Sequence, residues 1–368
     1  MSKIKETRLF LLLIILAIFL IYKNFTFQSR QKIIKGLKYL QYECLFDEDC
    51  GGWGDRLKGV LSAYAFAKIL NRKFVIKMIK DCDLNNFFEP NDIDWDYRKI
   101  PKNLSSIELK YGSNIDYMNS IKTNYNVFQT DKPLIRFKAS LMLMNVIPEI
   151  PIFRNKTKLL GQTDESKIHM AYFLNDWYEQ MFKLKKEFRP KYKSFLKRLK
   201  PNKHTKMICA QIRLGDTGQY AYRDKDLQKD FWKFINKTFL IDKDPKINYT
   251  LFITSDHEKV KKEAREIFSD IEVVFNENSS LHIELLSKEN KCKQVEDILF
   301  DFHLMQNCDI GVVSHSGYGI LGLWNRPDPF KDLYVYTKRD QNDMRNDYWM
   351  RKNMTFLKFS KAEDIYFT

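Results

Sequence analysis

The chain has 368 residues, a length that favours two domains, each large enough to bury a core of its own. Lysine and arginine total 62 against 47 aspartates and glutamates, and the resulting charge of +15 is spread along the chain, so it suits polyanions, anionic membranes and phosphorylated small molecules equally. The six histidines show no metal-ligand spacing and the six cysteines form no C-x-x-C pair, which argues against a structural metal site.

The first predicted element is an uncleaved signal anchor. Leu9–Tyr22 is an uninterrupted apolar run between a basic tail (1–8) and Lys23, and no small-residue cleavage site follows it. The positive-inside rule puts the tail in the cytosol and everything after residue 22 in the lumen. We therefore expect a single-pass type II protein of the Golgi or ER membrane. Seven N-x-S/T sequons and an even number of cysteines agree with a luminal, glycosylated body.

Cysteine spacing suggests two disulfides, although pairing cannot be deduced from sequence. Cys44 with Cys50, and Cys292 with Cys308, each bracket a short segment. Cys209 lies in an apolar strand pattern and is interpreted as a buried thiol.

The region after a short stem (23–37) begins with a βαβ unit. A strand over Lys38–Cys44 is followed by a glycine turn, an amphipathic helix to about Leu70 and a strand over Lys73–Met78. Residues 79–150 predict acceptor-side loops and short helices. The pattern becomes helical from about Asp164, and Phe182–Lys200 predicts a charged, solvated helical connector broken near Pro190. Residues 38–200 are thus expected to form an N-terminal, acceptor-side Rossmann-like domain.

Residues 201–368 alternate between apolar strands and amphipathic helices. The predicted strands are Met207–Ile212, Tyr249–Thr254, Ile271–Phe275, Asp309–Ser314 and Asp332–Tyr336. The predicted helices are Phe231–Phe239, His257–Phe268, Gln294–Asn307 and Gly317–Trp324. Such alternation indicates a parallel sheet covered on both faces. We expect an α/β protein of GT-B type, with two doubly wound Rossmann-like domains facing a cleft, because tandem domains of this kind resemble many sugar-nucleotide glycosyltransferases.

Polar residues follow the predicted strands of both halves. Ligands of doubly wound sheets bind outside the carboxyl ends of the strands, so these residues are the candidate site. They are Gln211, Arg213 and Asp216; Thr254, Ser255 and Asp256; Ser314, His315, Ser316 and Gly317; and, from the glycine turn, Gly51, Gly52, Gly54 and Arg56.

Arg213 is the sharpest single candidate. An arginine at the end of a buried strand is placed to give a bidentate fork to a diphosphate. A structural salt bridge from Arg213 to Asp216 is an equally good interpretation of these residues taken alone.

The motifs together resemble the fucosyltransferases that make α-1,2, α-1,6 and protein O-linked fucose. The segment 211–216 (QIRLGD) is similar to the family's H-x-R-x-x-D, and GGWGDRL to its early G-x-G-N/D-[QR]-L. ITSDHEKV is similar to its strand-end S-D element, and DFHLMQNCDIGVVSHSG to its closing segment. The resemblance touches most of 44–70 and 207–324; the middle, 79–200, has no match.

The resemblance implies a role for each matched residue. Arg213 would neutralise the β-phosphate of GDP-fucose as the nucleotide leaves, and Asp256 and Asp301 would contact the nucleoside. Ser314, Ser316 and Gly317 would line the phosphates at a helix start, where free N–H groups favour an anion. The glycines would let the backbone approach the donor phosphates, with Arg56 adding charge; a tight turn with nothing bound is the simpler alternative.

Gln211 stands where the family usually has histidine, which leaves the general base open among Asp216, Asp224 and Asp226. The implied activity is inverting transfer of fucose from GDP-fucose to a glycan or glycoprotein acceptor without an essential metal or other cofactor. Asp94-Trp95-Asp96 has the D-x-D form of metal-binding transferases but is interpreted as a loop. Ser314 stands where a hydrolase elbow needs glycine, which argues against a serine hydrolase.

Two other functions stay open. The same fold could take another sugar nucleotide, or the chain could be a glycan-binding pseudoenzyme that has lost turnover. Nucleic acid is not expected as a partner behind a membrane anchor.

Overall fold

The computed structural model describes Phe19 and residues 36–111, 116–161, 169–215, 227–241, 244–277, 290–314, 316–336 and 359–362. The predicted anchor at 9–22 lies outside the described residues apart from Phe19, and Asp216, Asp224, Asp226 and His315 lie outside them too. A search of the described ranges finds no helix with the length and apolar character needed to cross a membrane.

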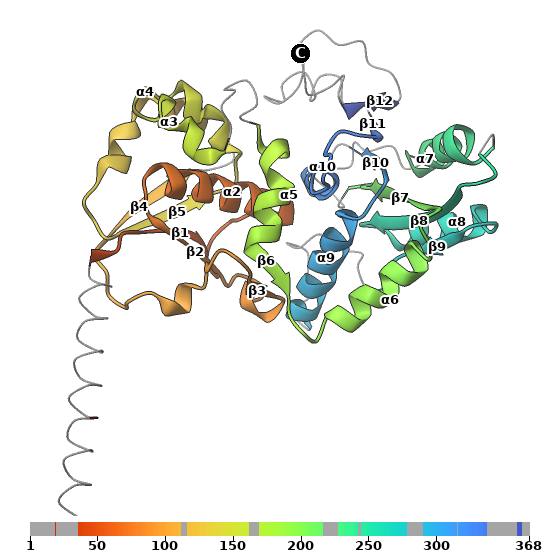
Figure 1. The fold of residues 1–368 in the computed structure, drawn as a ribbon, viewed down its shortest axis with the longest axis horizontal. Coiled ribbons are helices and arrows are strands. Elements are labelled where there is room, and N and C mark those ends of the chain that lie inside the picture. Colours follow the sequence, from red (N-terminus) through yellow and green to blue (C-terminus); the bar gives the residue numbers. More distant parts are fainter. Residues whose placement is uncertain are drawn as a thin grey trace, which may run out of the picture.

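The N-terminal lobe is built on a four-stranded parallel sheet in the order β2-β1-β5-β4 (Figure 1). Its strands are β1 (Tyr39–Cys44), β2 (Lys73–Met78), β4 (Ser106–Tyr111) and β5 (Leu134–Ala139). All six residues of β1 are buried, as expected of a central parallel strand covered on both faces. The predicted βαβ unit is confirmed, because β1 and β2 pair in parallel on either side of the helix α2 (Trp53–Ile69).

The C-terminal lobe is built on a six-stranded sheet in the order β12-β11-β10-β7-β8-β9. These strands are β7 (Thr205–Ile212), β8 (Asn248–Ser255), β9 (Glu272–Val274), β10 (Ile310–Ser314), β11 (Leu333–Tyr336) and β12 (Phe359–Lys361). All pair in parallel except β12, which adds an antiparallel edge that the sequence did not predict. The predicted α/β class is thereby confirmed.

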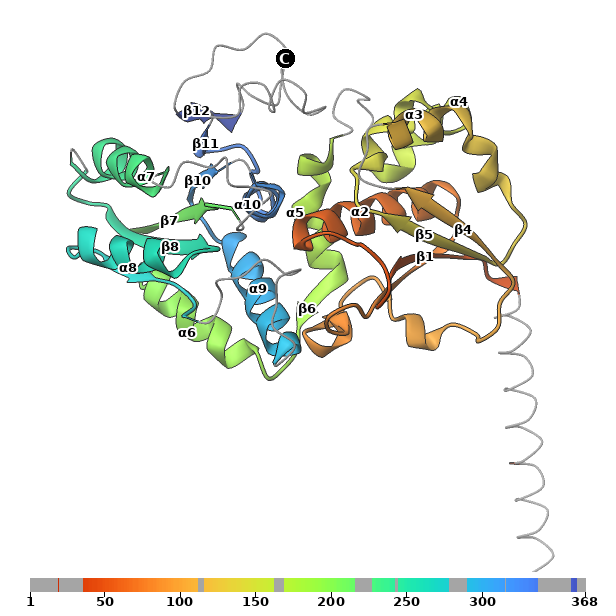
Figure 2. The ribbon, with the colours of Figure 1, turned by 180° about the vertical axis from the view of Figure 1, so that it is seen from behind.

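The remaining helices cover the sheets and join the lobes (Figures 1 and 2). They are α3 (Asp116–Thr123), α4 (Pro151–Arg154), α5 (Met170–Met181), α6 (Arg189–Leu199), α7 (Leu227–Ile235), α8 (Glu258–Ile267), α9 (Lys291–Met305) and α10 (Gly317–Trp324). A π-helical turn, Asn236–Leu240, extends α7, and short 3-10 segments span Leu84–Asn86, Tyr97–Lys99, Tyr125–Gln129, Leu143–Glu149 and Thr157–Leu160.

The expectation of only loops and short helices over 79–150 is wrong for two strands, β4 and β5. Both mix apolar and charged residues, and in β5 (LIRFKA) buried positions alternate with half-buried Arg136 and Lys138. These side chains form ion pairs with Glu108 of β4, so a charged, period-two strand pair sits at the edge of the sheet.

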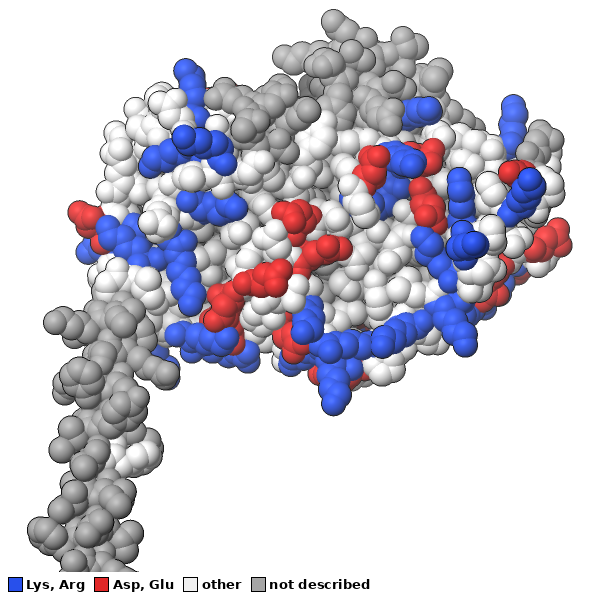
Figure 3. Space-filling view, in the orientation of Figure 1, with Lys and Arg blue, Asp and Glu red and all other residues white. Residues whose placement is uncertain are grey.

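The predicted helical connector over Phe182–Lys200 is wrong in its first part, because the helix α6 begins only at Arg189, next to Pro190. Proline occupies the first turn of α6, where its missing N–H costs nothing, so it begins the helix instead of breaking it. The residues just before it form a short strand, β6 (Phe182–Leu184), which pairs antiparallel with β3 (Phe88–Pro90). Lysine and arginine side chains of α6 form the band of positive charge along the lower edge of Figure 3, as expected of a solvated helix.

One hydrophobic core runs through both lobes. Side chains of α2 and α5 belong to the same cluster as those of α9 and α10. Trp53 of α2 packs edge-on against Phe302 of α9 with ring centroids 5.8 Å apart, and Tyr178 of α5 lies 5.7 Å from the same ring. A second cluster fills the other face of the C-terminal sheet, under α7 and α8.

The disulfides correct two of the three cysteine assignments. The Cys44–Cys50 bond is confirmed. Cys292 bonds to Cys82 and Cys308 to Cys209, so the proposed Cys292–Cys308 pair and the buried thiol at Cys209 are both wrong. The reason is α9, which has Cys292 in its first turn and ends shortly before Cys308; at 1.5 Å per residue, its length holds the two cysteines roughly 20 Å apart.

Candidate functional site

The carboxyl ends of β7 and β10 bring three of the predicted residues together. The Arg213 backbone N–H donates to Ser314 Oγ at 2.9 Å, and Ser314 Oγ donates to Gln211 Oε1 at 3.3 Å. Gln211 and Ser314 are buried, while Arg213 is half-buried at the end of its strand. Hydrogen bonds between neighbouring strands therefore fix the backbone from which the Arg213 side chain projects.

Asp256 anchors the loop that follows Arg213. Its two carboxylate oxygens accept the backbone N–H groups of Leu214 and Gly215, each at 2.9 Å. Gly215 has φ +99°, a conformation that strongly favours glycine, so the loop turns sharply at this point. The structure thus gives Asp256 a loop-positioning role beside Arg213, whereas the resemblance implied a nucleoside contact.

The amino ends of α2 and α10 meet between the lobes. A Cβ on Gly54 would lie 2.7 Å from the carbonyl carbon of Gly317 and 2.8 Å from the nitrogen of Tyr318, so only glycine allows this approach. Gly52, the N-cap of α2, has no side chain that could cap the helix, and Ser316, the N-cap of α10, makes no side-chain capping hydrogen bond. First-turn N–H groups without such caps, in two adjacent helices, favour an anion.

Lys58 and Asp55 lie at the same junction, and sequence reasoning missed them. The Lys58 ammonium pairs with Asp55 at 2.8 Å and would lie 3.4 Å from a Cβ on Gly317. A cation beside helix N-termini is unfavourable unless a negative charge balances it. The i,i+4 spacing of Gly54 and Lys58 on α2 is the signal that could have located this residue.

Arg56 does not face an open cleft. Its side chain is 1% exposed, and its guanidinium donates to the carbonyl oxygens of Gly51 and Lys80 and to the Asp81 carboxylate. Burial disfavours ionised Asp81, but hydrogen bonds from Arg56 and Lys291 outweigh this and lower its pKa. The direct donor contact expected of Arg56 is therefore corrected to support of the glycine turn from inside.

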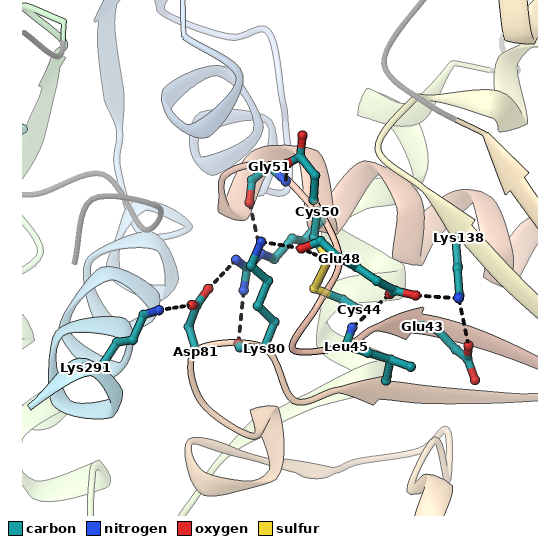
Figure 4. Close-up of a disulfide and its surroundings, with 12 residues drawn as sticks. Glu43, Cys44, Leu45, Glu48, Cys50, Gly51, Lys80, Asp81, Lys138 and Lys291 are labelled. Atoms are coloured by element: carbon teal, nitrogen blue, oxygen red, sulfur yellow. Dashed lines mark hydrogen bonds and ion pairs between the residues drawn. A yellow bond between two sulfur atoms is a disulfide. The ribbon is translucent and has the colours of Figure 1, made fainter. Parts of the chain in front are cut away.

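A disulfide-closed loop supports the turn from the other side (Figure 4). Within this loop Glu48 forms an ion pair with Lys138 of β5, and its other oxygen accepts the Leu45 backbone N–H at 2.9 Å. Burial opposes the charge of Lys138, but hydrogen bonds to Glu108 and Glu48 raise its pKa overall. The sequence offered no signal for this network, because its members come from separate strands.

Asp301 lies inside the C-terminal lobe. Its side chain, on α9, is fully buried. Burial lowers the pKa of Lys261, and the charge of Asp301 acts in the opposite sense, as expected of two groups in one buried cluster. In this arrangement a nucleoside contact by Asp301 would require the groups that cover it to move.

Two further predicted residues, Ser255 and Gly317, lie where a strand-end site requires them, and the D-x-D segment has only local ion pairs among the described residues. The Ser255 hydroxyl accepts the His257 backbone N–H at 3.1 Å, and Gly317 is exposed at the start of α10. In the D-x-D segment, Asp94 pairs with Lys99 and Asp96 with Arg98. No group of three or more metal-ligating side chains occurs among the residues that the structure describes.

No family model matches the sequence, and no curated protein sequence matches it. Among solved structures, Arabidopsis thaliana FUT1, a single-residue variant in complex with GDP, is similar over 85% of this chain and 75% of its own, with a TM-score of 0.59 and 12% identity. The α-1,6-fucosyltransferase NodZ from Bradyrhizobium, soaked with GDP-fucose, matches 83% of this chain and 96% of its own at a TM-score of 0.48 and 15% identity. POFUT1 in complex with GDP-fucose matches 80% and 96% at 0.43 and 12%. The chain shares its fold with FUT1.

Proposed function

We propose that this protein is a glycosyltransferase that moves fucose from GDP-fucose to a glycan or glycoprotein acceptor, with inversion and without an essential metal. The observation that carries the proposal is the joint placement of Arg213, held by strand-end hydrogen bonds, and the abutting N-termini of α2 and α10. Together they offer an arginine fork and free N–H groups, the groups that suit a pyrophosphate. The fold shared with FUT1, whose structure holds GDP, supports the same conclusion.

In the proposed reaction the acceptor hydroxyl attacks the anomeric carbon of fucose from the face opposite the nucleotide. Arg213 stabilises the negative charge that develops on the departing β-phosphate, and the helix N-termini act in the same sense. A general base takes the hydroxyl proton. Asp216, Asp224 and Asp226 remain the candidates for that base.

Gln211 bears on the choice between an enzyme and a pseudoenzyme. Its amide oxygen accepts from Ser314 and lies against Gly319, where a Cβ would be 2.1 Å away. A buried amide cannot accept a proton at neutral pH, so Gln211 supports the backbone of the site and supplies no acid or base. This departure from histidine is what favours a glycan-binding pseudoenzyme as the second candidate.

The proposal is tested by titrating the full-length chain, in detergent and EDTA, with GDP and with UDP in a calorimeter. We expect GDP to bind in preference to UDP, and Arg213→Ala to lose at least tenfold in affinity, about 1.4 kcal/mol, because one charge-assisted fork is removed. Arg265→Ala is the matched control, since Arg265 lies exposed on α8, where it contacts Glu277 and the Phe275 ring and none of the candidate site residues that the structure describes.

Binding of UDP in preference to GDP would mean that the donor is a UDP-sugar and not GDP-fucose. Full GDP affinity in Arg213→Ala would refute the assigned role of that arginine. GDP binding without transfer of labelled fucose to any acceptor would move the protein to the pseudoenzyme class.

The proposed setting is the Golgi or ER lumen, behind the anchor at 9–22. Protease protection of the body in intact microsomes tests that topology.

A further inference from the structure

The two lobes are joined by a second, non-peptide connection close to the candidate site. Cys82, in the loop after β2, forms a disulfide with Cys292 in the first turn of α9, across 210 residues of sequence. The residues just before them are also paired, because the Asp81 carboxylate contacts the Lys291 ammonium at 2.5 Å (Figure 4). An ion pair and a covalent bond therefore run side by side from the N-terminal lobe to the C-terminal lobe.

This connection leads directly to the glycine turn. Asp81, whose side chain is only 3% exposed, also accepts from Arg56 at 2.6 Å. The same guanidinium donates to the Gly51 carbonyl at 3.0 Å, immediately before the N-terminus of α2. A chain of contacts thus extends from α9 through Asp81 and Arg56 to the turn that abuts α10.

The Cys82–Cys292 disulfide differs from the other two in exposure. Both of its cysteines are half-buried, and the Asn86 side-chain amide lies 3.5 Å from each sulfur. The other four cysteines are buried, at 0 to 6% exposure. Since thiol–disulfide exchange requires a thiolate to reach a sulfur, this disulfide is the one of the three most open to a reductant.

The backbone on both sides of the connection is held in a left-handed conformation. Asp81 has φ +68°, and Asn290, the N-cap of α9, has φ +57°. Asp and Asn adopt this conformation more readily than other non-glycine residues, and contacts with their surroundings help to keep it. The two ion pairs of Asp81 and the adjacent disulfide are contacts that can do so, and loss of the disulfide removes part of that restraint.

We propose that Cys82 and Cys292 form a tether that a dithiol can reduce, and that the closed tether positions the glycine turn for the donor pyrophosphate through Asp81 and Arg56. The inference rests on the proposed function for its ligand. In the reaction a dithiol gives two electrons and two protons to the disulfide, which becomes two thiols while the dithiol becomes a disulfide. Asp81, Cys82 and Cys292 are positioning residues and contact no substrate.

The test begins with reduction of the full-length chain by graded dithiothreitol, followed by alkylation and mass spectrometry. We expect Cys82 and Cys292 to be alkylated before the four buried cysteines. With the Cys82–Cys292 disulfide reduced, GDP affinity should fall about tenfold, because fewer molecules then hold the glycine turn in the conformation that binds the pyrophosphate. The affinity should return on reoxidation. Earlier alkylation of any buried pair, or unchanged GDP affinity with Cys82 and Cys292 fully alkylated, overturns the proposal.

Two variants and one control test whether the tether positions the glycine turn or only stabilises the fold. Cys82→Ser/Cys292→Ser should reproduce the reduced state, and Asp81→Asn should weaken GDP in the same direction. Asp131→Asn should have no effect, because Asp131 pairs with Lys38 on an exposed surface. If a variant fails to fold, the reduced wild-type chain still decides, since it needs no substitution.

Hydrogen exchange of the Arg56 amide, whose N–H donates to the Gly52 carbonyl of the glycine turn at 3.0 Å, gives the readout that does not depend on a ligand. Faster exchange after reduction supports the tether, and unchanged exchange overturns it. A wild-type chain that binds no GDP refutes the donor proposal alone, and the exchange result then decides the tether by itself. A lower melting temperature with unchanged exchange and affinity would make the disulfide merely structural.

Discussion

At the scale of single residues, Gly54 sets how closely the two lobes approach. Because a Cβ there would lie within 3.0 Å of three backbone atoms of Gly317 and Tyr318, the contact cannot be relieved by turning a side chain. The neighbouring backbone itself would have to move, which separates the two helix N-termini that form the candidate anion site.

We therefore expect Gly54→Ala to destabilise the protein by about 1–3 kcal/mol, the usual cost of overpacking, and to weaken GDP binding as well. Melting temperature and calorimetric titration measure the two effects. Gly36→Ala is the control, because no heavy atom lies within 4 Å of a Cβ at that position. Wild-type affinity in a folded Gly54→Ala protein would show that the helix junction is not part of the ligand site.

His303 provides a pH-dependent test of the interlobe core. It packs on α9 with its Nδ1 3.4 Å from the Tyr178 hydroxyl, and burial lowers its pKa from 6.5 to about 3. The unfolded chain takes up the proton near pH 6.5 while the folded chain does so only near pH 3. Stability is therefore fully present above the higher value and is lost progressively as the pH falls between the two.

The expected loss is up to about 1.4 kcal/mol per pH unit from His303, and His169, whose pKa burial lowers to about 4, adds to it in the same sense. His303→Gln should flatten the curve of unfolding free energy against pH. His204→Gln, on an exposed turn, should leave the slope unchanged. Equal slopes in wild type and His303→Gln would mean that the imidazole takes up its proton as readily in the folded chain as in the unfolded chain.

At the scale of elements, the sequence was most informative where one period dominates. The strands β7, β8, β10 and β11 are largely buried on both faces and so appear as continuous apolar runs, while α8 shows a clear helical period. The limits of α10 and β2 agree residue for residue with the prediction. The strands β4 and β5 could not be found in this way, because charged residues interrupt their apolar pattern and gain partners only after folding. The strand β12 is only three residues long.

The same contrast applies to the candidate site. Arg213, Ser314 and the glycine turn could be located from the sequence because strand ends and glycine spacing follow from local pattern. The burial of Arg56 and the pairing of Cys82 with Cys292 could not, because both depend on which loops meet across the lobes. Lys58 could be predicted only in part. The sequence places it one helical turn after Gly54, but it does not show that this part of α2 lies beside α10.

At the scale of the whole molecule, the shared core argues that the lobes unfold together. Interfaces between domains of one chain are commonly polar and separable. Here Phe302, fully buried on α9 of the C-terminal lobe, contacts Trp53 of α2, Tyr178 of α5 and Tyr318 of α10 through ring pairs with centroids 5.6–5.8 Å apart. Neither lobe keeps its full core when the other unfolds, so intermediate states are unfavourable.

We expect one calorimetric transition, with calorimetric and van't Hoff enthalpies equal, in place of one transition per lobe. Phe302→Ala should lower the stability of the entire molecule by about 3–5 kcal/mol and keep the transition single, because the cavity lies in a core that both lobes use. Phe46→Ala, which truncates a ring that is 75% exposed, should change little. Two resolved transitions, only one of which moves in Phe302→Ala, would mean that the lobes are independent folding units, and the interlobe contacts would then guide the site without stabilising the fold.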